Sequence, residues 1–316
     1  PGVSALAPSA PALRRGAHGL GLLWRFSRPH TIVGTLLSVL GLYVVTVSEL
    51  PGLAVGAGLG DLAWTLLAGL CVNVFIVGLN QLEDIEIDQV NKPWLPVAAG
   101  ELTVPAARRI VALCGAVPVV LAVTQGAVEL AAVLCGLLVG VAYSSPPLRL
   151  KRWPTLAALA ISGVRAVVVN LGVALHFSGA LAGQAVVVGP VWALTLFVLP
   201  FSLAIAVLKD VPDLEGDRRY AIATFTVRLG PARAHRLGLG ALTVAYLGMA
   251  LAGPPLLDGV HGGVLAATHL VALGVLWAWA RGVDPSDPRA YTRFYLRVWL
   301  LFFCEYLVVP LAAVAA

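Results

Sequence analysis

Nine apolar stretches occupy most of the chain, and each is about as long as a bilayer is thick. A membrane-spanning helix needs about 20 predominantly apolar residues. Of the 316 residues, 59% are hydrophobic and only 12% are charged, which is roughly half the charged fraction of a soluble domain. The stretches are Thr31–Ser48, Leu62–Leu82, Ala106–Thr124, Val128–Tyr143, Leu156–Phe177, Ala185–Leu208, Pro231–Leu251, Gly263–Arg281 and Tyr291–Val314. The sequence therefore predicts an all-α polytopic membrane protein with nine transmembrane helices.

Positive charges are confined to alternate loops. If the N-terminus lies inside, 20 of the 21 Lys and Arg residues fall in the five internal segments. The external loops, near residues 49–61, 125–127, 178–184 and 252–262, hold none. Because cationic loops are retained in the cytoplasm, we expect a cytoplasmic N-terminus, or a stromal one in a plastid. The net charge of +5 then reflects topology and contact with anionic lipid, and we expect no nucleic-acid partner.

Acidic residues gather in two clusters on the predicted internal side, each directly after an apolar stretch. The first acidic motif contains Asn80, Asp84 and Asp88, and the second contains Asp210, Asp213 and Asp217. On continuous helices, these spacings of three and four residues would place each set on one face. Crowded carboxylates repel one another unless a cation lies among them. The pattern predicts a diphosphate site bridged by magnesium, with one Mg²⁺ ion at each motif, rather than solvated loop residues.

Cations flank both motifs and are candidates to bind the remaining phosphate oxygens. Lys92 follows the first motif, whereas Lys209 and Arg218 stand beside the second. Lys151 and Arg152 belong to the segment YSSPPLRLKRW, between the fourth and fifth stretches. All of them fall on the predicted internal side, so we expect them to neutralise the same diphosphate.

Four segments carry a resemblance to a known family. They read LWRFSRPHTIVGT, GLNQLEDIEIDQVNKPWLP, YSSPPLRLKRW and KDVPDLEGDRRYAIATFTVRLG. The chain resembles the UbiA superfamily of intramembrane prenyltransferases and, within it, the homogentisate prenyltransferases. The first motif of the superfamily commonly reads Asn-Asp-x-x-Asp-x-x-x-Asp. Gln81 stands in the second place here, a departure that is typical of the homogentisate branch.

The resemblance implies an architecture and the roles of site residues. Nine transmembrane helices would surround a central cavity, with cytoplasmic cap loops that carry the two Asp-rich motifs. Residues 31–316 would form a single integral membrane prenyltransferase domain after a cytoplasmic tail over residues 1–30, flexible at least over Pro1–Ala12. Asn80, Asp84 and Asp88 would hold one Mg²⁺ ion, and Asp213 and Asp217 the other, with Asp210 on the same face; Tyr143, Lys151 and Arg152 would contact the diphosphate. We expect Asp84, Asp88, Asp213 and Asp217 to be essential for catalysis.

The implied activity is a magnesium-dependent transfer of an isoprenoid chain from an allylic diphosphate, of phytyl or geranylgeranyl type, to an aromatic acceptor. For this branch the acceptor is homogentisate, which loses carbon dioxide, as in tocopherol and plastoquinone biosynthesis. The acceptor's carboxylate needs a cation, and Arg25, Arg28 and Arg165 are the candidates. Arg165 lies within a span, where a charge is functional by default. A structural partner for it, such as Glu129 or a helix-end carbonyl, is the alternative.

Three other functions fit parts of the pattern. The acceptor could be 4-hydroxybenzoate, a naphthoate or chlorophyllide, because motifs around the diphosphate are shared more widely than those around the ring. The same scaffold could also serve a membrane terpene cyclase, which needs no aromatic acceptor. A transporter is disfavoured because the predicted spans carry almost no ionisable residues at mid-depth besides Arg165 and Glu305.

Overall fold

Nine long helices span the molecule, as the sequence predicts. The structure, a computed structural model, describes residues 12–257 and 260–314. Within these ranges, nine helical runs are long and apolar enough to cross a membrane. They are α2 (Pro29–Ser48), α3 (Leu59–Glu83), α5 (Val104–Gln125), α6 (Ala127–Ser144), the run Pro154–Ala182, α9 (Gly189–Leu208), α12 (Pro231–Leu256), α13 (Gly262–Ala280) and α14 (Pro288–Val314). Each predicted stretch is confirmed to within a few residues of its ends.

Proline marks the first turn of many of these helices. Its fixed φ suits the start of a helix, and its missing N–H would have no partner there. Pro29, Pro105, Pro154, Pro190, Pro231 and Pro288 all lie at the first or second position of a spanning helix. The same residues therefore end the loops and begin the spans, which fixes where these six crossings start.

The fifth span is built from three pieces. It comprises α7 (Pro154–Ser162), the π-helical segment η2 (Gly163–Val169) and α8 (Asn170–Ala182). A π-helix holds more residues per turn than an α-helix, and such segments are frequent at functional sites. Arg165, a cation predicted to lie within a span, falls in this segment.

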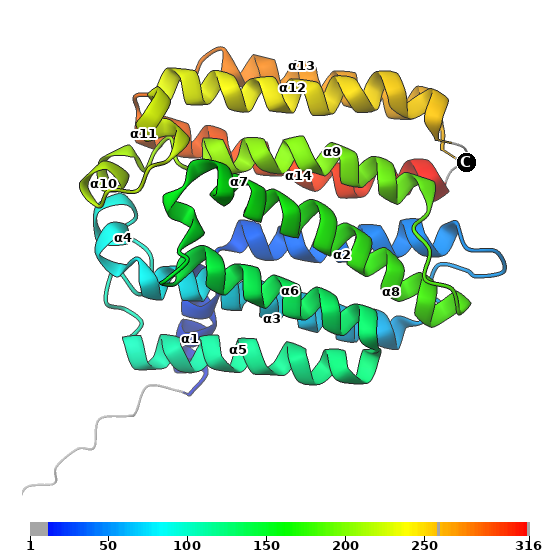
Figure 1. Cartoon of the computed structure of the whole chain (residues 1–316), viewed down its shortest axis with the longest axis horizontal. Coiled ribbons are helices and arrows are strands. Elements are labelled where there is room, and N and C mark those ends of the chain that lie inside the picture. The colour runs from blue at the N-terminus through cyan, green and yellow to red at the C-terminus, as the bar shows by residue number, and fades with distance from the viewer. Residues whose placement is uncertain (1–11, 258–259, 315–316) are drawn as a thin grey trace, which may run out of the picture.

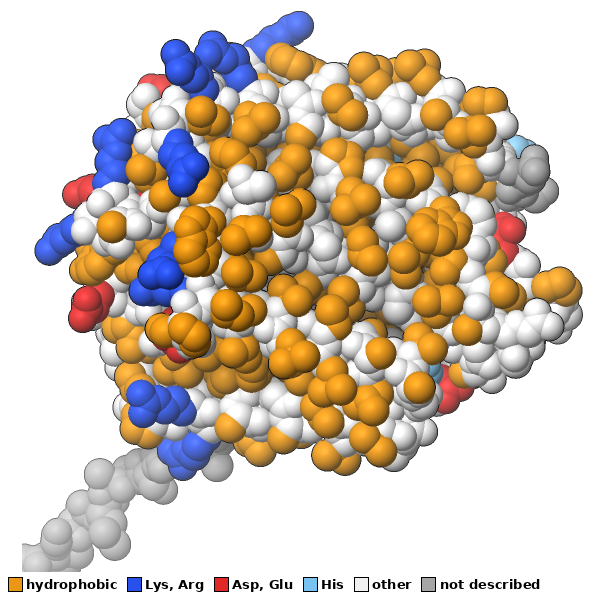
Figure 2. Space-filling view, in the orientation of Figure 1, with side chains coloured by type: hydrophobic (Ala, Val, Ile, Leu, Met, Phe, Trp, Pro, Cys, Tyr) orange, Lys and Arg blue, Asp and Glu red, His pale blue; other side chains and the backbone are white. Residues whose placement is uncertain are grey.

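The spans run side by side, and the short helices gather at one end of the bundle (Figure 1). These short helices are α4 (Ile85–Asn91), η1 (Leu150–Arg152), α10 (Leu214–Arg219) and α11 (Phe225–Leu229). We call this the motif end, because α4 and α10 belong to the two acidic motifs. Lys and Arg side chains are concentrated there, whereas hydrophobic side chains cover the middle of the visible face (Figure 2). The structure thus brings the cationic segments to one end of an apolar bundle, which belongs in a membrane.

Helix α1 (Ala12–Phe26) lies at the motif end and runs across the direction of the spans (Figure 1). The predicted tail over residues 1–30 therefore contains a helix, and residues 1–11 of that tail lie outside the described residues. Phe26 is fully buried and packs with Val97, Ala107 and Val111. This contact fixes the point at which the chain enters α2, beside the first acidic motif.

Close helix packing accompanies the Gly136-x-x-x-Gly140 pattern in α6. A Cβ atom at Gly140 would lie 2.8 Å from Cγ1 of Ile76, and one at Gly136 would lie 3.2 Å from Cγ1 of Val72. Both neighbours belong to α3. The two glycines therefore allow α6 to pack closely against α3.

Candidate active site

A cavity of about 1040 Å³ begins at the motif end and continues into the bundle. Residues from α2, α3, α6, the fifth span, α9 and α14 line it. Both acidic motifs form its mouth, and Thr65 and Glu129 mark its deep end. Since Thr65 lies fifteen residues before Asn80 on α3, this depth is about 22 Å at 1.5 Å per residue. The central cavity expected from the family resemblance is present.

The first acidic motif does not lie on one helix, which corrects the expectation of a single face. Helix α3 ends at Glu83, and Asp84 leaves helical geometry with φ −119° and ψ 22° before α4 begins. Carboxylates are unfavourable at the negative C-terminal end of a helix and favourable at the positive N-terminal end of the next one. The break at Asp84 meets the second preference, since it places Asp88 in the first turn of α4, although Asp84 itself also caps the end of α3. Asn80, Asp84 and Asp88 nevertheless all line the cavity.

The second acidic motif is likewise divided, so that its predicted single face is also wrong. Helix α9 ends at Leu208, and Asp213 caps the start of α10, which contains Asp217. Pro212 accounts for the interruption, because proline disfavours helical geometry at the residue before it and supplies no N–H. Asp210, Asp213 and Asp217 are buried and line the cavity from a turn and a short helix.

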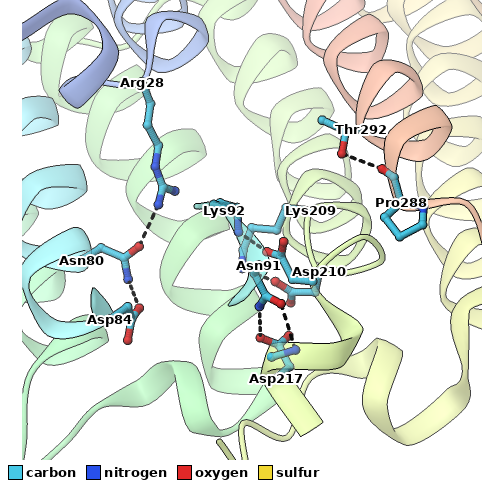
Figure 3. Close-up of polar contacts among 12 residues, drawn as sticks. Arg28, Asn80, Asp84, Asn91, Lys92, Lys209, Asp210, Asp217, Pro288 and Thr292 are labelled. Atoms are coloured by element: carbon cyan, nitrogen blue, oxygen red, sulfur yellow. Dashed lines mark hydrogen bonds and ion pairs between the residues drawn. The ribbon is translucent and has the colours of Figure 1, made fainter. Parts of the chain in front are cut away.

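Ion pairs and hydrogen bonds hold the two motifs together at the mouth (Figure 3). Lys92, just after α4, pairs with Asp213, just before α10. Asn91 Oδ1 accepts a hydrogen bond of 2.9 Å from the Gly216 N–H, and its amide donates one of 3.4 Å to Asp217. Segments more than a hundred residues apart are thereby joined, so the two acidic motifs form one site.

Within each motif, a lysine neutralises a carboxylate. Nζ of Lys151 lies 2.5 Å from Asp84 Oδ1, and Nζ of Lys209 lies 2.5 Å from Asp210 Oδ1. Burial lowers the pKa of Lys151, and Asp84 opposes that shift. Both lysines thus line the cavity directly beside an acidic motif.

Two carboxylates at the mouth are less well neutralised. Asp88 Oδ2 and Asp217 Oδ2 are buried and have no hydrogen-bond partner among the described residues. Burial raises the pKa of Asp88, and burial together with Asp210 and Asp213 raises the pKa of Asp217 to about 8. A carboxylate in this situation is stabilised by a nearby cation. One such oxygen in each motif fits the predicted site for two metal ions.

The donor set suits magnesium. Among the described residues, no three His, Cys, Asp or Glu side chains converge as a preformed cage. Magnesium needs no such cage, because it keeps several waters and binds through one or two carboxylates together with substrate phosphates. The residues present therefore fit Mg²⁺ bound jointly with a diphosphate.

The predicted diphosphate-binding residues divide into two groups. Lys92, Tyr143, Lys151 and Lys209 line the cavity. Arg152 and Arg218 do not line it. The exposed Arg152 guanidinium lies 4.8 Å from the Trp153 ring centroid, and the exposed Arg218 borders a smaller cavity of about 740 Å³. In the 3₁₀ turn η1, neighbouring side chains point in different directions, so Lys151 is buried while Arg152 is not.

Sequence reasoning missed Arg149, whose Nη2 lies 3.2 Å from Asp84 Oδ1. Three cations stand close together in LRLKR, and their spacing does not say which point inward. It also missed the side of the cavity formed by α14, where Arg289, Arg293 and Trp299 line the wall. No acidic motif marks that helix, although its Arg-rich first turns were a visible signal.

The three candidate arginines for the acceptor occupy different depths. Arg25 pairs with Glu101 in an exposed contact at the rim. Arg28 adopts a left-handed conformation with φ 53°, and its Nη2 donates a 3.2 Å hydrogen bond to Asn80 Oδ1. Arg165 lines the cavity farther inside. These contacts tie Arg25 and Arg28 to the mouth and leave Arg165 as the interior cation.

Arg165 stacks on aromatic rings instead of pairing with an acid. Its guanidinium carbon lies 4.8 Å from the Trp299 ring centroid and 5.4 Å from that of Phe302. Its Nη1 has no hydrogen-bond partner among the described residues. The carboxylate of Glu129, the alternative partner, lies instead beside Thr65 and 4.0 Å from His176. Arg165 is therefore a half-buried cation within a span, and its buried Nη1 donor is available to a ligand.

Gln81 has a structural contact that explains the departure from the superfamily's usual motif. It is buried, and its Nε2 donates a 2.7 Å hydrogen bond to the backbone carbonyl of Phe26. An Asp in this place would have no N–H to donate and would repel that carbonyl. The amide thus anchors the end of α1 to α3 and lies apart from the cavity lining.

Comparisons with known proteins agree with this geometry. The model of the UbiA prenyltransferase family matches residues 35–302. A homogentisate phytyltransferase from Synechocystis is 45% identical over 291 residues, which cover 92% of this chain and 94% of that protein. The chloroplastic homogentisate solanesyltransferase of Arabidopsis thaliana is 36% identical, with 98% and 81% covered. A solved UbiA homologue from Archaeoglobus fulgidus, bound to GPP and Mg²⁺, shares the fold with a TM-score of 0.64 and 18% identity, over 93% of this chain and 100% of that one.

Proposed function

Because the chain belongs to the UbiA prenyltransferase family and is an aromatic prenyltransferase, we propose that it transfers a C20 group to homogentisate. The donor is phytyl or geranylgeranyl diphosphate, and the product is a precursor of tocopherol- or plastoquinone-type compounds. One observation carries the proposal most directly. A single cavity joins both acidic motifs at its mouth to the guanidinium of Arg165 inside an apolar bundle.

The mouth of the cavity binds the diphosphate. Asn80, Asp84 and Asp88 hold one Mg²⁺ ion, and Asp213 and Asp217, with Asp210, hold a second. Magnesium, when bound, neutralises the diphosphate so that it becomes a good leaving group. A UbiA homologue bound to both GPP and Mg²⁺ supports the dependence on magnesium. The two buried carboxylate oxygens without hydrogen-bond partners support the number of ions.

Lysines complete the charge balance of the leaving group. Lys92, Lys151 and Lys209 already pair with Asp213, Asp84 and Asp210. All three ammonium groups line the mouth of the cavity, where each can donate to a phosphate oxygen of the bound diphosphate. Charge that develops as the allylic C–O bond breaks is thus met by groups already in place, which is the main source of electrostatic catalysis.

The interior of the cavity separates the allylic cation from water. Its walls are largely apolar, and the helix bundle excludes water from the prenyl group once that group lies inside the mouth. Arg165 binds the acetate carboxylate and so holds the ring of homogentisate beside the cation. A ring carbon then forms the new bond to the prenyl group and loses its proton. The carboxyl group leaves as carbon dioxide, and a proton replaces it to give a methyl group.

The exposed end of the site faces the cytoplasm, or the stroma in a plastid. The arrangement of cations at the motif end supports this orientation. The test of the function is purified protein in lipid nanodiscs with Mg²⁺, homogentisate and a panel of prenyl diphosphates, with products identified by mass spectrometry. A prenylated methylquinol supports the proposal. Prenylation of 4-hydroxybenzoate but not of homogentisate would contradict it.

A further inference from the structure

The deep end of the cavity carries a layer of polar side chains that the chemistry at the mouth does not use. Thr65 on α3 and Glu129 on α6 both line the cavity and are buried. The Thr65 side chain lies beside the Glu129 carboxyl, and Nδ1 of the buried His176 on α8 lies 4.0 Å from Glu129 Oε2. Three spans thus each contribute one polar side chain at the same depth.

This layer is a poor surface for the end of a hydrocarbon chain. A chain that pushed past it would have to separate these polar groups and bury them against apolar carbon, which costs free energy. Between this layer and the mouth, the cavity is lined by small or apolar residues, among them Gly69, Ala132 and Val133. A prenyl chain therefore binds favourably as far as Thr65 and Glu129, and its binding beyond them is unfavourable.

The depth of the cavity matches a particular donor. Thr65 lies about 22 Å from Asn80 along α3, and Glu129 lies about 21 Å from Tyr143 along α6. Four isoprene units contain sixteen main-chain carbons and extend over about 20 Å with C–C bonds of about 1.5 Å. Nine units would need about 45 Å, which exceeds even the hydrocarbon thickness of a bilayer.

We propose that Thr65, Glu129 and His176 form a floor that limits the prenyl donor to about four isoprene units. This inference rests on the proposed function, since it assumes that the cavity holds the prenyl chain of a diphosphate. It means that the deep end of the cavity selects the length of the prenyl donor. Relatives differ in this respect, since one is named a phytyltransferase and another a solanesyltransferase.

A larger side chain at Gly69 would shorten the space available to the prenyl chain. Gly69 lies one turn above Thr65, about 6 Å nearer the mouth, and it lines the cavity. A Cβ atom there would meet Thr35 Cγ2 at 3.5 Å, an ordinary contact, so the backbone tolerates a side chain. The rest of a leucine at this position would fill space that the last isoprene unit needs.

The experiment measures the binding of C10, C20 and C45 prenyl diphosphates with Mg²⁺ and no acceptor, in nanodiscs. Wild-type protein should bind the C20 donor at least about tenfold more tightly than the C45 donor, since a few excluded methylene groups are worth that much. Gly69→Leu should weaken C20 binding about tenfold or more and change C10 binding less than about threefold. Gly274→Leu on the exposed surface of α13 is the matched control and should change neither.

A second variant opens the floor. Thr65→Ala combined with Glu129→Ala should narrow the gap between the C20 and C45 donors. Equal wild-type affinity for C20 and C45, or an equal loss of C10 and C20 binding in Gly69→Leu, would overturn the proposal. If the expected length dependence is measured but no prenylated homogentisate forms, the floor stands and the proposed acceptor is wrong.

Discussion

Replacing Arg165 with leucine tests the proposed acceptor site most directly. The guanidinium stacks on Trp299 and Phe302, and its buried Nη1 donor has no partner among the described residues. Removing one charged contact to a substrate carboxylate typically costs about 2–5 kcal/mol, which corresponds to a factor of about 30 or more. We expect the KM for homogentisate to rise by at least that factor.

The KM for the prenyl diphosphate should change less than about threefold, because the diphosphate binds at the mouth to other cations. The stacking on Trp299 and Phe302 exists without substrate, so its loss affects the stability of the fold rather than the selectivity between substrates. Initial rates measured over a grid of both substrate concentrations separate the two constants. Arg165→Lys, which keeps the charge, should recover part of the loss.

Arg297→Leu provides the matched control. Arg297 also lies on a spanning helix, and its guanidinium carbon lies 5.7 Å from the Trp279 ring centroid, but it is exposed. This variant loses an arginine and a stacking contact without touching the cavity, and it should leave both KM values unchanged. An equal rise in both KM values for Arg165→Leu would refute the reasoning and assign Arg165 a structural role.

Three further predictions concern the mouth and the topology. Asp217→Asn should lower kcat at least about 100-fold while leaving the melting temperature unchanged or higher, because it removes a metal ligand and a buried carboxyl whose ionisation is unfavourable; retention of near-normal turnover would exclude Asp217 as a ligand. Lys151→Ala should lower kcat/KM for the diphosphate by about 30-fold or more, whereas Arg152→Ala should change it less than about threefold, and the reverse order would contradict the observed directions of the two side chains. In oriented vesicles, a cysteine from Arg219→Cys should react with an impermeant maleimide from the cytoplasmic side and one from Gly56→Cys only from the other side; labelling of both from one side would be incompatible with the proposed orientation.

The spans were predictable because hydropathy alone determines them. Even the shortest predicted stretch, Val128–Tyr143, corresponds to a complete helix, Ala127–Ser144. A bilayer accepts few alternatives to a helix for an apolar segment of this length. The charge asymmetry also holds in three dimensions, since the cationic segments converge at the motif end (Figure 2).

The local geometry of the motifs was less predictable, since spacing alone assumes an unbroken helix. Asp84 lies at a junction between two helices, and Pro212 separates Asp210 from α10. Each residue of the predicted motifs still reaches the cavity, because breaks of one residue at Asp84 and of five residues over 209–213 leave them at the same end of the bundle. Residue type therefore identified the site even where the assumed backbone was wrong.

Side-chain direction in the loops could not be read from the sequence. Arg149, Lys151 and Arg152 are chemically similar and nearly adjacent, yet two contact Asp84 and one points outward. The helix α1 was also missed, because it lacks a long apolar run. Its Leu20, Leu23 and Trp24 are exposed, as in a helix that lies along a membrane surface instead of crossing it.

The π-helical segment Gly163–Val169 has a consequence for how this span can change. A π-helix is equivalent to an α-helix with one inserted residue, so the residues before and after Arg165 are about 100° out of phase with each other. Deleting one valine from this segment would restore a regular α-helix. The deletion would rotate α7 and α8 relative to each other about the helix axis. Either α7 would lose its register with η1, or α8 would rotate His176 away from Glu129. An alignment of this chain with a relative whose fifth span is a regular α-helix would therefore need a gap in this segment, because without one it would pair cavity-facing residues in one chain with lipid-facing residues in the other.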